Sequence, residues 1–324
     1  MYAMIVEQLG GPSALERVER PSPEPGTGEV AIAVEAIGCN FADILITKGE
    51  YQHRPELPFS PGSEVAGRVA RVGAGVDGLH EGQRILALLD HGGYASEVVA
   101  AAADVHPIPD AVSCEHAVAL GVVYQTSWLA LKHRAPLREG ETLLVHAAAG
   151  GVGLAAVQIG AAMGARVIGT AGSPDKLQLA REHGATEALS YRDGGWVERV
   201  NELTDGRGAD VIFDPVGGDA FERSTKCIAW EGRLHVIGFA SGTIPSMRMN
   251  RVMLKNISLV GLHWGPYRRH DPALIQRAMQ DLFAMHERGD VRPLVGATFP
   301  LEHAADALES LGGRKTTGKV ILTP

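Results

Sequence analysis

The chain has 324 residues, of which 30 are basic and 38 acidic, so its formal net charge is −8. This length favours two domains with separate cores, and the acidic balance gives no support for a nucleic-acid-binding face. Three widely spaced cysteines, Cys39, Cys114 and Cys227, form no metal-binding or redox pair and indicate a reducing compartment. Because the N-terminus has no basic stretch and apolar core of a signal peptide, we expect a cytoplasmic protein.

The first 120 residues have the pattern of a compact β domain. Residues 29–38 and 64–73 alternate apolar and polar side chains, which is typical of half-buried strands. Glycine and proline interrupt this half closely, as in PSPEPGTG at 21–28, and such residues mark turns between short strands.

From about residue 122 strands alternate with helices, which favours a parallel sheet with covering helices. The uncharged stretch 143–165 is rich in glycine and alanine and reads as a buried strand, turn and helix, not as a membrane span. An amphipathic helix is predicted at 272–290 and a final strand at 318–324. The other predicted strands are 141–147, 165–171, 209–217, 233–240 and 256–264, and the other predicted helices are 152–165 and 173–184.

The turn after the first strand of this second half reads HAAAGGVG. Compared with the dinucleotide fingerprint G-x-G-x-x-G it gives Ala148, Gly150 and Gly153, with alanine in place of the first glycine. A side chain at Gly150 would block a pyrophosphate, and one at Gly153 would hold the helix off the strand. The N–H groups at the helix start would then bind the phosphates. The alternative is a tight glycine-rich turn that serves packing alone.

The end of the next strand predicts which dinucleotide binds. An NAD site places a carboxylate there for the ribose 2′-hydroxyl, but this strand ends TAGSPDK at 170–176. Ser173 and Lys176 instead suit a 2′-phosphate, with one hydroxyl and one positive charge. Ser173 followed by Pro174 is also a good helix cap, and both roles can hold together. We therefore expect NADPH.

These motifs together resemble the zinc-independent quinone oxidoreductases, the zeta-crystallin-like family of the medium-chain dehydrogenase/reductase superfamily. The resemblance implies a GroES-like β-rich catalytic domain at 1–121 and 290–324, and a Rossmann domain with a doubly wound parallel sheet at 122–289. It also implies NADPH in the cleft between them. The stretches that carry it are GCNFADILITKGEY (38–51), LPFSPGSEVAGRV (57–69), HAAAGGVG (146–153), SPDK (173–176), FDPVGGD (213–219), GFASG (238–242), NRVMLKNISLVGLHWG (250–265) and RKTTGKVIL (314–322).

The same family comparison predicts that no metal is bound. Zinc-containing relatives have a cysteine and a histidine at positions that match Asn40 and Ser63 here, and neither of these residues is a plausible zinc ligand. Without a Lewis acid the site is poorly equipped to polarise an isolated carbonyl. Quinones and α,β-unsaturated carbonyls accept hydride more readily because they spread the developing charge.

The resemblance also implies roles for individual residues. Asn40 would lie by the nicotinamide and the acceptor oxygen, or would only satisfy local backbone in a turn. Tyr51 would line the acceptor pocket as a proton donor or a stacking ring, or would be an ordinary half-buried tyrosine. Glu64 reads equally as one partner of a buried pair or as a catalytic group. The expected cofactor-binding residues are Asn40, Thr126, Ala149, Gly150, Gly151, Val152, Gly153, Gly172, Ser173, Lys176, Tyr191, Phe239, Ala240, Ser241 and Arg314, and Lys315 could exchange roles with Arg314.

The sequence therefore predicts an NADPH-dependent reductase of quinones or similar conjugated acceptors. One alternative is an enoyl-type reductase of unsaturated ketones, aldehydes or thioesters. Another is a structural or RNA-binding protein that holds NADPH without turnover. We expect a small-molecule substrate, no nucleic acid, no membrane span and, by resemblance at residues 256–264, a homodimer.

Overall fold

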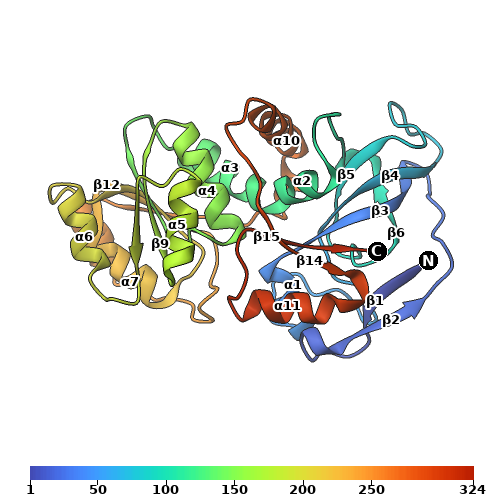
Figure 1. Ribbon diagram of the computed structural model, residues 1–324, viewed down its shortest axis with the longest axis horizontal. Helices are drawn as coiled ribbons and strands as arrows, with labels where there is room; N and C mark the ends of the chain where they lie inside the picture. Colours follow the sequence, from blue (N-terminus) through green and yellow to red (C-terminus); the bar gives the residue numbers. More distant parts are fainter. The chain divides into compact units, whose positions relative to one another are not determined.

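The computed structural model describes residues 1–324 and divides them into two compact units (Figure 1). Unit 1 comprises Met1–Val122, Gly265–Glu287 and Pro293–Pro324, and unit 2 comprises Val123–Trp264 and Arg288–Arg292. The sequence boundaries placed all of 122–289 in the cofactor domain, whereas the structure places 265–287 in unit 1.

Polar contacts explain why this segment belongs to unit 1. The Arg268 guanidinium donates to both carboxylate oxygens of Asp104, at 3.1 and 2.7 Å, and to Asp90 at 3.1 Å. Gln276 Nε2 donates to the carbonyl of Ala103 at 3.0 Å. These bonds attach α9 (Tyr267–His270) and α10 (Pro272–Glu287) to the β-rich unit. The sequence separation of more than 160 residues hides this attachment from local pattern analysis.

Unit 1 is built on a mostly antiparallel sheet with strand order β14-β15-β3-β4-β5-β7, and β6 pairs with β3. Val30, Ile32 and Ile37 of β3 are completely buried and pack in one core with residues of the neighbouring strands, and an irregular register between Val34 and Ala36 separates Ile37 from the other two. The strands are β1 (Tyr2–Val6) and β2 (Leu15–Glu19), which form a separate pair, and β3 (Glu29–Cys39), β4 (Glu64–Val72), β5 (Arg84–Leu88), β6 (Glu97–Ala101), β7 (Val105–Pro107), β14 (Val295–Pro300) and β15 (Lys319–Thr323).

The helices of unit 1 are short apart from α10. Gly49 ends α1 with φ +73°, a left-handed conformation that glycine adopts without strain. Ser113 caps α2 by accepting from the N–H of His116 at 3.2 Å. The bounds are α1 (Phe41–Lys48), α2 (Cys114–Ala119) and α11 (Ala304–Gly312), with 3₁₀ turns at Pro12–Ala14, Ala102–Asp104 and Leu301–His303.

Unit 2 is a parallel sheet of order β10-β9-β8-β11-β12-β13. Counted from β8, this is the doubly wound order 3-2-1-4-5-6, in which ligands bind beyond the carboxyl ends of the strands. The sequence expectation of a Rossmann sheet is confirmed. The strands are β8 (Thr142–Val145), β9 (Arg166–Ala171), β10 (Glu187–Ser190), β11 (Ala209–Asp214), β12 (Ile228–Val236) and β13 (Ser258–Gly261), and the helices are α3 (Gln125–Trp128), α4 (Gly151–Ala162), α5 (Pro174–Glu182), α6 (Trp196–Leu203), α7 (Gly218–Cys227) and α8 (Met249–Lys255).

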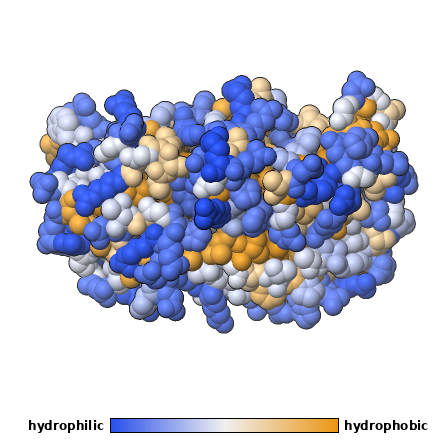
Figure 2. Space-filling model, turned by 45° about the horizontal axis from the view of Figure 1, so that its top comes forward, coloured by the Kyte–Doolittle hydropathy of each residue, from blue (hydrophilic) through white to orange (hydrophobic).

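Two π-helical segments, Leu120–Tyr124 and Leu129–Arg134, flank α3. The backbone leaves helical geometry at Gly121, where ψ is −112°. No helix in the structure combines the length and apolar character that crossing a bilayer requires. The face of the molecule in Figure 2 is mostly hydrophilic, with hydrophobic groups between the polar residues.

Candidate functional site

The turn after β8 is held by backbone hydrogen bonds. Ala147 takes a left-handed φ of +51°, the Gly150 N–H donates to Ala147 O at 2.9 Å, and the Ala148 N–H donates to Thr170 O at 3.0 Å. A Cβ added at Gly153 would overlap the carbonyl of Ala147, so only glycine lets α4 lie this close to the turn. The predicted role of Gly153 in helix–strand packing therefore has a direct physical cause in the chain.

Gly150 differs, because its Cβ would contact nothing closer than Ala147 O at 3.4 Å. The chain itself therefore does not require glycine here, and a side chain would stand in the space beside the turn. The N–H groups in the first turn of α4, at Gly151–Gly153, have no carbonyl acceptor within the helix. Space in front of such donors fits the phosphates of a dinucleotide.

A buried histidine supports this turn from behind. His146 Nδ1 lies 2.9 Å from Thr170 Oγ1, and Nε2 lies 2.8 Å from Ser224 Oγ. The ring packs edge-on against Trp196, and burial lowers its pKa. His146 is thus a neutral residue that ties three parts of unit 2 together.

At the carboxyl end of β9 the structure brings four predicted residues together. Ser173 Oγ caps α5 by accepting from the Lys176 N–H at 3.4 Å, so the capping role is present. A Cβ added at Gly172 would overlap Tyr191 Oη, which shows that the tyrosine ring lies over this glycine. The strand end carries no carboxylate from Gly172 to Pro174.

The turns after β11 and β12 pack against each other. Asp214 Oδ1 accepts from the N–H groups of Val216 and Gly217 at 2.8 and 3.0 Å, so this buried carboxylate shapes the turn. The predicted stretch Phe239–Ser241 lies on that turn: the Ala240 N–H donates to Pro215 O at 3.1 Å and the Ser241 N–H to Val216 O at 2.9 Å.

Thr126 is half-buried on α3, beside a residue that contacts the cofactor turn. The neighbouring Ser127 Oγ donates to Val152 O at 2.9 Å and also lies 3.1 Å from Val123 O. This bond fixes α3 against the start of α4. Most of the predicted residues of unit 2 therefore lie at the carboxyl edge of its sheet, on the turns that follow β8, β9, β10 and β12. Thr126 lies on α3.

In unit 1, Asn40 begins α1 and is 8 % exposed. Asn40 and Asp43 form a capping box at the start of this helix. The Asn40 side chain also makes two longer-range bonds: Nδ2 donates to Glu64 Oε1 at 2.9 Å, and Oδ1 accepts from Lys319 Nζ at 2.7 Å. The amide therefore makes hydrogen bonds beyond the local backbone. The amide belongs to a buried cluster assembled from three strands or strand ends.

Glu64 lies at the centre of this cluster and is completely buried. It forms an ion pair with Lys319, which is 3 % exposed, and its second oxygen accepts from the Val122 N–H. A Cβ added at Gly38 or at Gly121 would overlap one of its carboxylate oxygens. Two glycines thus create the space for this charge. Sequence reasoning considered Glu64 but missed Lys319; a lysine at the start of the apolar strand KVIL was the available signal.

A second buried carboxylate lies next to this pair. Asp43 Oδ2 accepts from the Asn40 N–H at 2.7 Å and from Tyr94 Oη at 3.0 Å. Burial raises the pKa of Asp43 to about 6, against the opposing effect of these donors and of Lys319. Burial also raises the pKa of the Cys39 thiol to about 12, so this cysteine is protonated and unreactive.

Tyr51 follows α1 and packs partly buried against the core of unit 1. Burial raises the pKa of its phenol, and the Asp43 carboxylate adds to the effect. Arg314 lies exposed after α11 with a left-handed φ of +56°. Both residues are in unit 1, apart in sequence from the glycine turn of unit 2.

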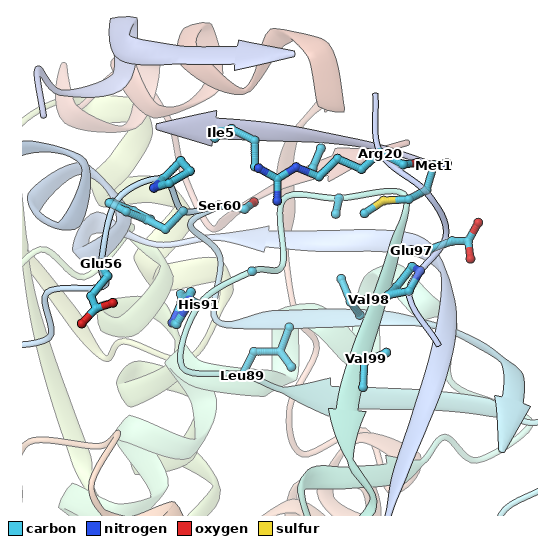
Figure 3. Close-up of a pocket in the computed structure, with 16 residues that line it drawn as sticks. Met1, Ile5, Arg20, Glu56, Ser60, Leu89, His91, Glu97, Val98 and Val99 are labelled. Atoms are coloured by element: carbon cyan, nitrogen blue, oxygen red, sulfur yellow. Dashed lines mark hydrogen bonds between the residues drawn. The ribbon is translucent and has the colours of Figure 1, made fainter. Parts of the chain in front are cut away.

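Figure 3 shows a cavity of about 320 Å³ in unit 1. It is lined mainly by apolar side chains, such as Ile5, Leu89 and Val98, with the Arg20 side chain extending across it and His91 and Glu56 on one side. None of the predicted site residues lines this cavity, so it is separate from the candidate site.

Two family models match the chain in the order of its two units. The Alcohol dehydrogenase GroES-like domain matches residues 26–110, and the Zinc-binding dehydrogenase model matches residues 151–280. No group of three or more His, Cys, Asp or Glu side chains in the structure is arranged to hold a metal ion. The two family models together assign the chain to the medium-chain dehydrogenase/reductase superfamily.

Individual relatives narrow this class. The chain is 42 % identical to Quinone oxidoreductase-like protein 2 homolog of Nematostella vectensis, over 99 % of this chain and 88 % of the relative. It is 39 % identical to a quinone oxidoreductase of Pseudomonas aeruginosa over 97 % of both chains. The Escherichia coli quinone oxidoreductase, solved in complex with NADPH, superposes with a TM-score of 0.95 at 33 % identity over the full length of both chains. The chain therefore belongs to the quinone oxidoreductase family.

Proposed function

We propose that this protein is an NADPH-dependent oxidoreductase that reduces quinones or similar conjugated acceptors. The observation that carries the proposal is the end of β9, where Lys176 and Tyr191 accompany Gly172 and no carboxylate stands from Gly172 to Pro174, Asp175 lying instead in the first turn of α5. The family supplies the acceptor class, because the Pseudomonas aeruginosa relative is named a quinone oxidoreductase and the Escherichia coli structure contains NADPH.

We assign cofactor binding mainly to unit 2. The pyrophosphate would lie against Ala149–Gly153, the 2′-phosphate would contact Ser173 and Lys176, and Phe239–Ser241 and Thr126 would border the nicotinamide end. Tyr191 would pack beside the adenosine phosphate. Arg314 of unit 1 adds a further positive charge for that phosphate. Gly150 supports this assignment because the chain leaves space where its side chain would be.

The acceptor side is assigned to Asn40 and Tyr51 of unit 1. When bound, NADPH supplies a hydride, which together with a proton reduces a quinone to a hydroquinone and leaves NADP⁺. The Tyr51 phenol, whose pKa burial raises further above its ordinary value of 10.0, carries its proton at neutral pH and would donate it as negative charge develops on the acceptor oxygen. Asn40 orients the ring and the oxygen through its amide.

The same cluster argues against zinc assistance. The Asn40 oxygen already accepts from a buried ammonium, Lys319 Nζ, at 2.7 Å. This oxygen therefore already has a donor in the position from which it would bind a metal cation. An acceptor that delocalises its own negative charge needs no such ion.

We also propose that the protein is cytoplasmic and dimeric. The three cysteines are free thiols, which fits a reducing compartment. β13 is an edge strand, and exposed apolar residues lie on it and on the neighbouring β12 and α8: Trp230, Met249, Met253, Leu254 and Leu259. Exposed edges and apolar patches of this kind favour pairing with a second copy, and light scattering of the eluting protein tests the dimer.

The decisive experiment follows NADPH oxidation at 340 nm with benzoquinones, naphthoquinones, enones and enoyl thioesters. We expect turnover with the quinones and much slower reaction with NADH in place of NADPH. Turnover confined to enones or thioesters would favour the enoyl-type alternative. Tight NADPH binding without oxidation by any acceptor would contradict the proposed function and favour a binding protein.

A further inference from the structure

We propose that Lys319 and Glu64 are positioning residues that fix the side-chain amide of Asn40 in one orientation toward the acceptor and the nicotinamide. The proposal rests on the function proposed above, in which Asn40 contacts these groups. Neither Lys319 nor Glu64 touches the reacting atoms in it. Both act through the amide that they hold.

The two partners of Asn40 are chemically opposite, and this makes the orientation unambiguous. An ammonium group can only donate hydrogen bonds, and an ionised carboxylate can only accept them. Lys319 Nζ donates to Oδ1 at 2.7 Å, and Glu64 Oε1 accepts from Nδ2 at 2.9 Å. A flipped amide would point its NH₂ group at the ammonium and its oxygen at the carboxylate, and both contacts would be repulsive.

The fixed amide can still make a further hydrogen bond. Nδ2 has one hydrogen left after its bond to Glu64. The residue is 8 % exposed, so little of it besides this hydrogen is available to a ligand. A single donor held in place can meet the negative charge that develops on an acceptor oxygen without the reorganisation that a rotating side chain requires.

The cluster is itself rigid. Lys319 also donates to the Glu64 oxygen that holds Nδ2, and the other Glu64 oxygen accepts from the Val122 N–H. Gly38 and Gly121 leave space for these oxygens and for nothing larger. Because the ammonium and the carboxylate are both almost completely buried, removing one charge leaves the other without a partner.

A double-mutant cycle between Lys319→Met and Asn40→Ala tests the proposal. We expect each single variant to lower kcat with a naphthoquinone by roughly 10- to 100-fold, which is the cost of one charged hydrogen bond. If Lys319 acts through the amide, the double variant is no slower than Asn40→Ala within about twofold. Effects that multiply in the double variant would overturn the proposal, because Lys319 would then act independently of Asn40.

Lys319→Met leaves Glu64 buried without its partner and risks unfolding. A double variant with Lys319→Met and Glu64→Gln removes both charges, and we call it the neutral pair. If thermal unfolding shows that the single variant Lys319→Met is not folded, the neutral pair takes its place in the cycle. Lys48→Met, an exposed lysine of the same unit, is the matched control and should leave kcat and the unfolding temperature unchanged. Normal kcat in the folded neutral pair would overturn the proposal.

Direct binding separates failure of this inference from failure of the proposed function. Fluorescence titration should show weaker NADPH binding to Lys319→Met and Asn40→Ala, with the same non-additivity. Binding of adenosine 2′,5′-bisphosphate, which has the phosphate but no nicotinamide, should change by less than about twofold. If the wild type reduces no quinone, the proposed function fails and the titration still decides whether Lys319 orients Asn40. Equal losses for both ligands would overturn the inference.

Discussion

The glycine turn of unit 2 and the charged cluster of unit 1 are held together in two different ways. In the turn, three of eight consecutive residues, 146–153, are glycines, and the shape depends on the local path of the backbone. In the cluster, side chains separated by 24 and 255 residues hold one another. The first is a local device that tolerates change elsewhere in the chain, whereas the second fails if any member is lost.

The largest effect is expected from the turn. Gly153→Ala would place a Cβ against the carbonyls of Ala147 and His146, which are backbone atoms and cannot move aside cheaply. We expect NADPH affinity to fall more than about 100-fold and stability to fall by about 3 kcal/mol. Gly195→Ala, where a Cβ meets nothing within 4 Å, is the control. Fluorescence titration measures the NADPH affinity, and thermal unfolding measures the stability. An unchanged NADPH affinity in Gly153→Ala would mean that the backbone of the turn can move aside for the added Cβ.

The next effect addresses the phosphate end of unit 2. Lys176→Ala should raise the KM for NADPH by roughly 10- to 30-fold and the KM for NADH by less than about threefold, because only NADPH has the 2′-phosphate that this charge binds. Lys226→Ala, an exposed lysine on α7, serves as the control. Steady-state kinetics with both cofactors give the answer, and equal increases would remove the case for phosphate recognition.

On the unit 1 side, Tyr51→Phe removes a phenol proton but keeps the ring. We expect kcat to fall by roughly tenfold with little change in the quinone KM, as when a proton donor is replaced by water. In the wild type, kcat should fall at alkaline pH as the Tyr51 phenol loses its proton. In Tyr51→Phe this fall should be absent. A higher KM with unchanged kcat would instead assign Tyr51 to ring stacking alone.

The smallest effect concerns the buried carboxylate beside the cluster. The pKa of Asp43 is raised from its ordinary value of 3.8 to about 6, so the folded protein binds its proton more tightly than the unfolded chain does. Stability must therefore fall as pH rises between these two values and be constant above them. Relative to Asp43→Asn, the wild type should lose up to about 1 kcal/mol per pH unit in this interval. Denaturant unfolding at several pH values measures the difference; parallel curves would contradict the raised pKa.

The sequence predicted the parallel sheet and its glycine turn because both are local patterns. Hydrophobic runs and glycine spacing within 30 residues specify β8, α4 and β9 without reference to the rest of the chain. The convergence of Gly172 and Tyr191 was implied only by the family resemblance, because β10 (Glu187–Ser190) was not among the predicted strands.

The long-range parts could not be predicted in this way. Lys319 reads as an ordinary strand residue until β15 is placed beside β3, with Val320 opposite Cys39. The return of residues 265–287 to unit 1 depends in the same manner on Arg268 meeting Asp90 and Asp104. Neither hydrophobic periodicity nor a short motif specifies such pairings, because they depend on which strands and helices lie side by side in the folded protein.

The position of β15 has a consequence for how the protein is made. This strand lies between β14 and β3 in the sheet, yet its first residue, Lys319, follows Asn40 by 279 residues in the chain. Unit 2, nearly continuous in sequence, is complete before Lys319 is synthesised and can fold during translation. Until residue 319 emerges, Glu64 has no ammonium beside it, and the Asn40 amide has no donor to its oxygen. The charged cluster is thus assembled only after the residues of unit 2 have been synthesised.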